Sequence, residues 1–182
     1  EKAGISSIIV SKTLRTWGDS ESGLAEKLSD EIERLDEEGG ATIAFLASGI
    51  EGLKVRLTAK GESRSEVEEI LNSEAKIVSS ILGDEVIFSY DDQTIEEVVL
   101  GLCRDKGLTL GVAESLTGGL IGSRLTSISG SSDVFKGSVV AYSSEVKRTI
   151  LGVPDVPSVS QAAAESMAVG VCKALNADIG LA

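Results

Sequence analysis

Apolar and polar positions alternate differently in the two halves of the chain. In the first half, apolar or alternating runs predict strands over residues 5–10, 41–47, 53–59 and around 86–88. Apolar residues at helical spacing predict an acidic helix over residues 24–35 and a second helix over residues 67–81. Strands interleaved with a few helices predict a small α+β unit, in which residues 41–59 form a hairpin.

The second half repeats a strand-to-helix pattern. Thr94 and Glu97 form a capping box that predicts the start of a helix, and an apolar strand is expected over residues 108–113. Leu120, Ile121 and Leu125 have the spacing of the helix that follows this strand, and residues 137–147 again read as a strand that enters a helix. The expected fold class is α/β, with an α+β unit followed by a three-layer α/β domain.

Composition limits the classes of partner. The 182 residues suffice for one or two domains, and two are expected. A net charge of −12 repels nucleic-acid phosphates and anionic membranes, so neither is an expected partner. Two sparse cysteines, no long apolar run and no visible signal peptide predict a protein of the reducing cytoplasm.

The run of residues 114–119 places a serine and two glycines where the strand passes to the helix. Free N–H groups at a helix start can hold a phosphate or a developing oxyanion beside the Ser115 hydroxyl. The same run is also typical of an ordinary capping serine with a glycine turn, which the motif alone favours.

A base for Ser115 has to come from elsewhere, because the chain contains no histidine. If Ser144 caps the next helix, Lys147 lies in its first turn, where the helix dipole disfavours a cation. Such a lysine can accept a proton from a serine, with Tyr142 as relay. A core-edge tyrosine and a solvated lysine are the commoner outcome for each residue alone. No metal site is expected without histidine, although a carboxylate magnesium site stays open.

Three linked motifs resemble the C-terminal domain of the CinA family, the competence/damage-inducible proteins. They are A-E-S-x-T-G-G at residues 113–119, S-G-S-S-x-x-F-x-G at residues 129–137, and Y-S-x-E-x-K at residues 142–147. The resemblance implies a cofactor-free amidohydrolase that converts nicotinamide mononucleotide to its acid in pyridine nucleotide salvage. It implies Ser115 as nucleophile, with Tyr142 and Lys147 activating it. Ser138 departs from the glycine that the family commonly has there.

Substrate contacts are expected from two loops. Glu114 is a candidate for orienting the base or the substrate, and the N–H groups around Thr117, Gly118 and Gly119 are candidates for holding the oxyanion or the substrate phosphate. Gly130 and Ser131 could add phosphate donors from a second loop, or form a plain turn between helix and strand.

The first half also resembles the family, whose longer members carry a KH-like middle domain. Residues 1–22 are then a linker from an absent N-terminal domain, residues 23–92 the middle domain and residues 93–182 the amidohydrolase domain. The G-x-x-G at residues 49–52 matches an RNA-binding loop only superficially and is interpreted as a hairpin turn. The final strand at residues 178–182 looks cut short, which implies an incomplete substrate pocket.

Two functions of different class therefore stay open. The first is a nicotinamide mononucleotide amidohydrolase, expected as a homodimer. The alternative is a module of the same fold that works by dimerisation or by regulating another domain. Another amidase or peptidase is a further alternative within the enzyme class.

Overall fold

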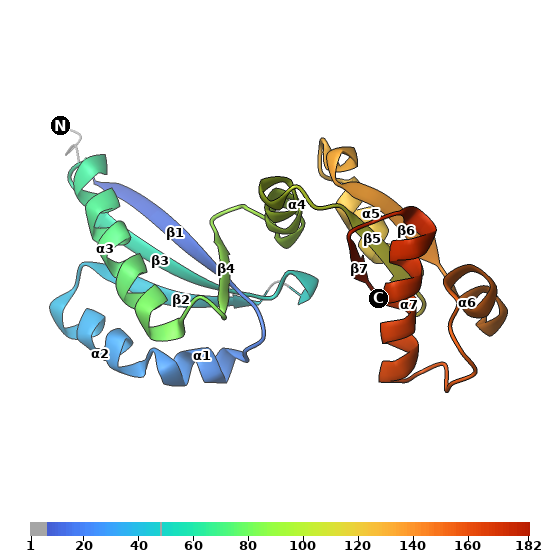
Figure 1. Cartoon of the computed structure of the whole chain (residues 1–182). Helices are drawn as coiled ribbons and strands as arrows, with labels where there is room; N and C mark the ends of the chain where they lie inside the picture. Colours follow the sequence, from blue (N-terminus) through green and yellow to red (C-terminus); the bar gives the residue numbers. More distant parts are fainter. Residues whose placement is uncertain (1–6, 48) are drawn as a thin grey trace. The chain divides into compact units, whose positions relative to one another are not determined.

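The computed structural model describes residues 7–47 and 49–182 and divides at Ile95 into two units (Figure 1). Unit 1 ends at Ile95 and unit 2 runs from Glu96 to Ala182. Each unit has its own sheet, with one hydrophobic core in unit 1 and two in unit 2 among the described residues.

Unit 1 is a four-stranded antiparallel sheet with helices packed on it, in the strand order β2-β3-β1-β4. The expected hairpin is confirmed, because β2 and β3 pair directly through a single 3-10 turn at Gly49–Glu51. The elements in chain order are β1 (Ile8–Thr16), α1 (Glu21–Lys27), α2 (Ser29–Glu38), β2 (Ala41–Ala47), β3 (Leu53–Gly61), α3 (Arg64–Leu82) and β4 (Ile87–Tyr90).

Strand β1 corrects the expectation of a linker over residues 1–22. Residues 8–16 lie inside the sheet, paired with β3 on one side and with β4 on the other. Leu14 is fully buried in the core, so this segment is an integral part of unit 1. The expected strand over residues 5–10 is found only from Ile8, and its residues 5 and 6 lie outside the described residues.

The helices of unit 1 bury the face that the sequence predicted. Leu24, Leu28 and Leu35 are all buried in one cluster with the sheet. The expected single helix over residues 24–35 is nevertheless two helices that meet at Leu28. The Ser29 hydroxyl donates to the Glu26 carbonyl at 2.9 Å, and this local side-chain bond competes with continuous helical pairing.

A charged network joins α2 to α3. The Arg34 guanidinium donates at 2.6 Å both to Glu31 and to Glu74. The hydrogen bond with Arg34 holds the pKa of Glu31 below its usual value, whereas burial raises the pKa of Glu74. Unit 1 thus neutralises two largely buried carboxylates with one cation.

Unit 2 is a three-layer α/β domain around a parallel sheet in the strand order β6-β5-β7. Leu110 and Val112 of β5 pack with α4 and α5, and Ala113 packs with α6 and α7 on the opposite face. The expected α/β class is therefore confirmed. The elements are α4 (Ile95–Lys106), β5 (Leu110–Glu114), α5 (Leu120–Thr126), a 3-10 turn at Ser131–Asp133, β6 (Phe135–Val140), α6 (Ser144–Leu151), α7 (Gln161–Leu175) and β7 (Ile179–Leu181).

Helix α7 packs very closely on its neighbours, and the sequence pattern did not predict it. A Cβ at Gly170 would lie 2.0 Å from the Leu151 carbonyl oxygen, and one at Gly180 would lie 2.0 Å from the Ala168 carbonyl oxygen. Glycine at both positions lets backbones touch at these contacts.

Candidate functional site

The carboxyl ends of β5 and β6 meet at one edge of the sheet of unit 2. Glu114 is opposite Val140 in the parallel register, and the Ala141 N–H donates to the Glu114 carbonyl at 2.7 Å. Ser115 follows the end of β5 and Tyr142 follows the end of β6. The fold thus brings the candidate nucleophile and the candidate relay to the same edge.

The turn that carries Ser115 depends on two glycines. Gly118 and Gly119 have φ values of +61° and +103°, which other residues rarely adopt. The Gly118 N–H donates to the Ser115 carbonyl at 3.1 Å and closes the turn. Ser115 itself is half-buried, whereas the neighbouring Leu116 is 91% exposed.

Glu114 is buried at the base of this turn, with 2% of its surface exposed. Burial alone would raise its pKa, but hydrogen bonds from backbone N–H groups and from the Ser138 and Thr117 hydroxyls outweigh burial and hold the pKa below its usual value. The Glu114 carboxylate accepts hydrogen bonds from the N–H groups of Gly119 (3.1 Å), Ile121 (2.9 Å) and Gly122 (2.8 Å) and from the Ser138 hydroxyl (2.8 Å).

These bonds correct two expectations about the turn. Glu114 does not face a substrate, because its carboxylate is occupied within the fold. The N–H groups of Gly118 and Gly119 are likewise taken, by Ser115 and by Glu114. Among residues 116–122, all of them described, the N–H groups of Leu116 and Thr117 are the ones with no protein acceptor.

Lys147 lies one helical position later than expected. The Ser143 hydroxyl, rather than that of Ser144, caps α6 by accepting from the Val146 N–H at 3.2 Å. Lys147 is 6% exposed, so its side chain is buried, whereas a lysine on a helix is more commonly solvated. Its side chain lines a cavity of about 180 Å³, together with Ser144, Arg148, Val153, Pro154, Asp155, Val156 and Ser158.

Tyr142 contrasts with Lys147 because it is 77% exposed. No hydrogen bond joins Ser115, Tyr142 and Lys147 to one another in the described part of the chain. The fold therefore gathers the three residues around one end of β5 and β6 without preassembling a proton relay. Catalytic hydrogen bonds are often formed only when substrate binds.

Gly130 and Ser131 lie at the opposite edge of the same sheet. They precede β6, whereas Ser115 and Tyr142 follow their strands, and all the strands run in one direction. A five-residue strand spans roughly 15 Å, so this loop is separated from Ser115 by about the length of the strand. The Gly130 carbonyl instead accepts from Arg104 at 2.8 Å, which supports the turn interpretation.

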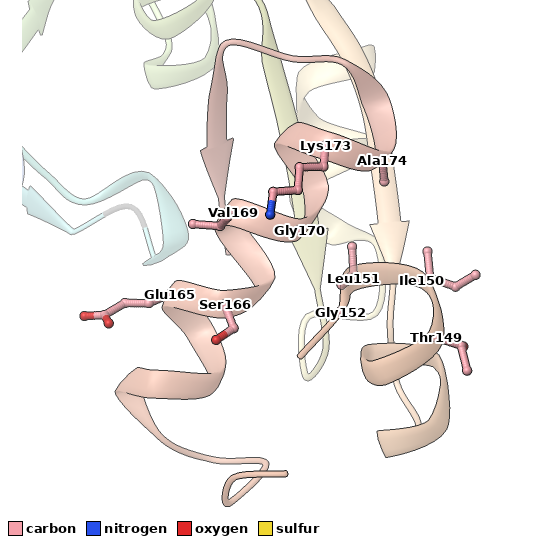
Figure 2. A pocket seen from close by; sticks show the side chains of 10 residues that line it. All are labelled: Thr149, Ile150, Leu151, Gly152, Glu165, Ser166, Val169, Gly170, Lys173 and Ala174. Atoms are coloured by element: carbon pink, nitrogen blue, oxygen red, sulfur yellow. The ribbon is translucent and has the colours of Figure 1, made fainter. Parts of the chain in front are cut away.

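A wider groove of about 610 Å³ lies between the end of α6 and the middle of α7 (Figure 2). Figure 2 labels Ile150 on α6 and Val169 on α7, two of its lining residues, and each is more than half exposed. None of Ser115, Tyr142 and Lys147 lines this groove, so the candidate chemistry belongs to the strand ends. The lining residues are Thr149, Ile150, Leu151, Gly152, Glu165, Ser166, Val169, Gly170, Lys173 and Ala174.

Neither a metal-binding cluster nor a membrane-spanning helix occurs within residues 7–47 and 49–182. Within these ranges, no group of three or more acidic residues or cysteines is placed to hold a metal ion. Nor does any helix of the same ranges have the length and apolar character needed to cross a membrane.

The fold and the site together define a two-unit protein whose parallel α/β unit carries a serine, a tyrosine and a buried lysine near one sheet edge. The CinA C-terminal domain matches residues 92–182, and the KH domain of damage-inducible protein CinA matches residues 11–87. The chain belongs to the CinA family.

Relatives with similar sequences include CinA-like proteins of Frankia casuarinae, 42% identical over the whole chain, and Dictyoglomus turgidum, 41% identical over 97% of it. The chain spans 42% and 43% of the length of these two relatives. A solved competence/damage inducible protein from Agrobacterium tumefaciens is 35% identical, covering 46% of this chain and 53% of its own, with a TM-score of 0.44.

Proposed function

We propose that unit 2 is an amidohydrolase that converts the carboxamide of nicotinamide mononucleotide to the acid and releases ammonia. One observation carries the proposal: parallel strands bring Ser115 and Tyr142 to the same edge, and the helix after Tyr142 contributes the buried Lys147. Amide hydrolysis needs an activated nucleophile, an oxyanion site and a proton for the leaving nitrogen. The three side chains are suited to supply the nucleophile and the proton, and the free N–H groups of Leu116 and Thr117 are suited to supply the oxyanion site.

The reaction proceeds through an ester of Ser115. The serine oxygen bonds to the carboxamide carbon while its proton passes through Tyr142 to Lys147. The carbonyl oxygen becomes negative and accepts hydrogen bonds from the N–H groups of Leu116 and Thr117. The C–N bond then breaks as the nitrogen takes the proton and leaves as ammonia. Water hydrolyses the ester, which forms the acid and regenerates the serine.

Replacing the nucleophile tests this assignment. Ser115→Ala should lower ammonia release from nicotinamide mononucleotide by at least about 10³-fold, because no ester can form. Ser123→Ala is the matched control, since Ser123 is exposed on α5. Activity of Ser115→Ala near that of the control would overturn the nucleophile assignment.

Replacing Lys147 separates proton transfer from electrostatic attraction. Lys147→Met keeps the length of the buried chain without an amine, and Lys147→Arg keeps the charge without a group that releases its proton near neutral pH. Both variants should lose activity if Lys147 is the base. Near-normal turnover of Lys147→Arg would show instead that Lys147 binds the substrate phosphate as a fixed cation.

The enzyme assignment as a whole is tested against the non-catalytic alternative. A folded wild-type protein that self-associates but releases no ammonia from this substrate would favour the dimerisation or regulatory module. Ammonia release that depends on Ser115 would exclude that alternative.

A further inference from the structure

The Glu114 carboxylate is buried without a cation. In the described residues no lysine or arginine pairs with it, and its hydrogen bonds come from backbone N–H groups and from hydroxyls. An ionised carboxylate is costly to bury and is kept only where donors replace its lost water. An ordinary cap is the residue directly before the helix, here Gly119, whereas Glu114 lies five residues earlier, so its bonds to the start of α5 require another explanation.

The position of the carboxylate supplies that explanation. Glu114 ends β5 and directly precedes Ser115, yet its side chain bonds to the N–H groups of Gly119, Ile121 and Gly122 in the first turn of α5. The hydrogen bonds therefore tie both ends of the turn at residues 115–118 together. The donors that would otherwise attract an external anion are already occupied by a protein carboxylate.

We propose that Glu114 is a positioning residue, whose buried carboxylate clamps β5 to α5 and so fixes Ser115 and the free N–H groups of Leu116 and Thr117 around the reacting carbon. The catalytic part of this inference rests on the proposed function. It deepens that function in one respect: the substrate phosphate does not bind at the start of α5, because Glu114 occupies that position.

Ser138 belongs to the same clamp. Its hydroxyl donates to Glu114 at 2.8 Å from the neighbouring strand β6, which brings a third element into the hydrogen-bonded set. On the elements packed against Glu114, Arg124 of α5 pairs with Glu96, Lys136 lies near the opposite end of β6, and Glu165 and Lys173 of α7 line the groove in Figure 2. Hydroxyl and amide donors thus dominate the surroundings of the carboxylate.

Chemical rescue is the sharpest test of a positioning carboxylate. Glu114→Ala leaves a small space lined by unpaired N–H donors, which acetate or formate fits and chloride does not reproduce. Ammonia release by Glu114→Ala should fall on the order of 10²-fold, the effect of a nucleophile displaced by about an ångström. Acetate should restore much of it, and sodium chloride at equal ionic strength should not. Equal responses to both salts would overturn the proposal.

Glu114→Gln and Ser138→Ala keep the test informative if Glu114→Ala fails to fold. Glu114→Gln has nearly the same volume but presents an amide to donors, so kcat should fall while KM stays within about twofold of wild type. A rise in KM with unchanged kcat would show that Glu114 binds substrate and would contradict the proposal. In Ser138→Ala, the acid limb of the pH profile should move to higher pH, because one donor to the carboxylate is lost.

A readout without substrate separates this proposal from the proposed function. The rate at which a fluorophosphonate labels Ser115 should fall in Glu114→Gln and recover with acetate in Glu114→Ala. If the reagent labels Ser115 of the wild type but the protein releases no ammonia, the assigned amide substrate is wrong. The labelling rates of the Glu114 variants then still test the positioning role of Glu114. If Ser115 is not labelled at all, the clamp is tested by the pH at the midpoint of acid unfolding. This pH should be higher in Ser138→Ala than in the wild type, and an unchanged midpoint would overturn the clamp.

Discussion

Unit 1 and unit 2 bury their apolar surface in different ways. Unit 1 has one core on one face of its sheet, built mainly from leucine and valine. Unit 2 has two thin cores, one on each face, and the core beneath α6 and α7 contains Ala113, Ala141 and Ala163. In unit 2 glycine brings backbones into contact, as at Gly170. The contrast therefore lies between the core of unit 1 and the core beneath α6 and α7, in which three of the seven buried residues are alanine and Gly170 lets α7 touch the end of α6.

The two units also stabilise buried carboxylates differently. In unit 1, Glu31 and Glu74 share the Arg34 guanidinium, which joins two helices. In unit 2, Glu114 has amide and hydroxyl donors and organises a single turn. A cation holds two elements together over a distance, whereas directed amide donors fix the local backbone. The second arrangement suits a site where a serine must be held in place.

Among the variants that test this comparison, Gly170→Ala should have the largest effect on the unfolding free energy. The added methyl group would lie 2.0 Å from the Leu151 carbonyl oxygen, so α7 must move away from α6. We expect a loss of at least about 4 kcal/mol in the unfolding free energy of unit 2, with unit 1 unaffected. Hydrogen exchange measured peptide by peptide would show it. Unchanged protection of α6 and α7 would contradict the close approach.

Leu57→Ala tests the corresponding feature of unit 1. Leu57 is fully buried in the single core, and its truncation leaves a cavity between the sheet and the helices. The unfolding free energy of unit 1 should fall by about 3 kcal/mol. Denaturant unfolding followed by the fluorescence of Trp17, the only tryptophan of the chain, reports this unit. If hydrogen exchange showed an equal loss of protection in the peptides of unit 2, the core of unit 1 would not be independent of the cores of unit 2.

Acid should affect the two carboxylate arrangements unequally. The pKa of Glu114 is lowered in the fold, so its stabilising contribution is complete above its ordinary value of 4.5 and is lost as the pH falls below it. Glu31 behaves in the same way, but the pKa of Glu74 is raised, so its contribution changes with pH in the opposite sense and partly offsets that of Glu31.

Acidification from pH 6 to 3, a range that crosses 4.5, should therefore loosen the start of α5 before the contact between α2 and α3. The measurement is hydrogen exchange over that range, corrected for the intrinsic pH dependence of exchange. Earlier loss of protection in α2 and α3 would contradict the expectation.

Gly101→Ala should have the smallest effect and serves as the control for Gly170→Ala. Gly101 also lies inside a helix of unit 2, but a Cβ there would meet no atom within 4 Å. Alanine has the higher helix propensity, so the unfolding free energy should rise by about 0.5–1 kcal/mol. If thermal unfolding showed that Gly101→Ala is destabilised, helical glycines of unit 2 would be sensitive to substitution whether or not the added Cβ meets a neighbouring atom.

Local patterns predicted the elements best where one signal dominated. The run at residues 41–47 matches β2, and the expected helix at residues 67–81 lies within α3. The break at Leu28 was not predicted, because both helices present the same buried leucine face and only the Ser29 side chain marks the interruption. Helix α7 was missed because its buried positions include Ala163 and Gly170, which contribute little to an apolar pattern.

The sequence names candidate site residues, and their arrangement in the fold differs from the expected one. That Gly130 and Ser131 lie far from Ser115 follows from strand direction alone, since residues before and after a parallel strand lie at opposite edges. The sequence contained that signal. The burial of Glu114 could not be predicted in the same way, because a carboxylate at the end of a strand can face either solvent or the helix that follows.

The pairing of Gly122 with Ser138 has an evolutionary consequence. A Cβ at Gly122 would lie 2.7 Å from the Ser138 Cβ, so the two positions compete for one space between α5 and β6. While serine occupies position 138, a side chain at position 122 would clash with the Ser138 Cβ. Glycine at position 138 would remove this contact and make room for a side chain at position 122. The two sites are therefore epistatic, and the order in which mutations arise decides which of them a lineage can keep.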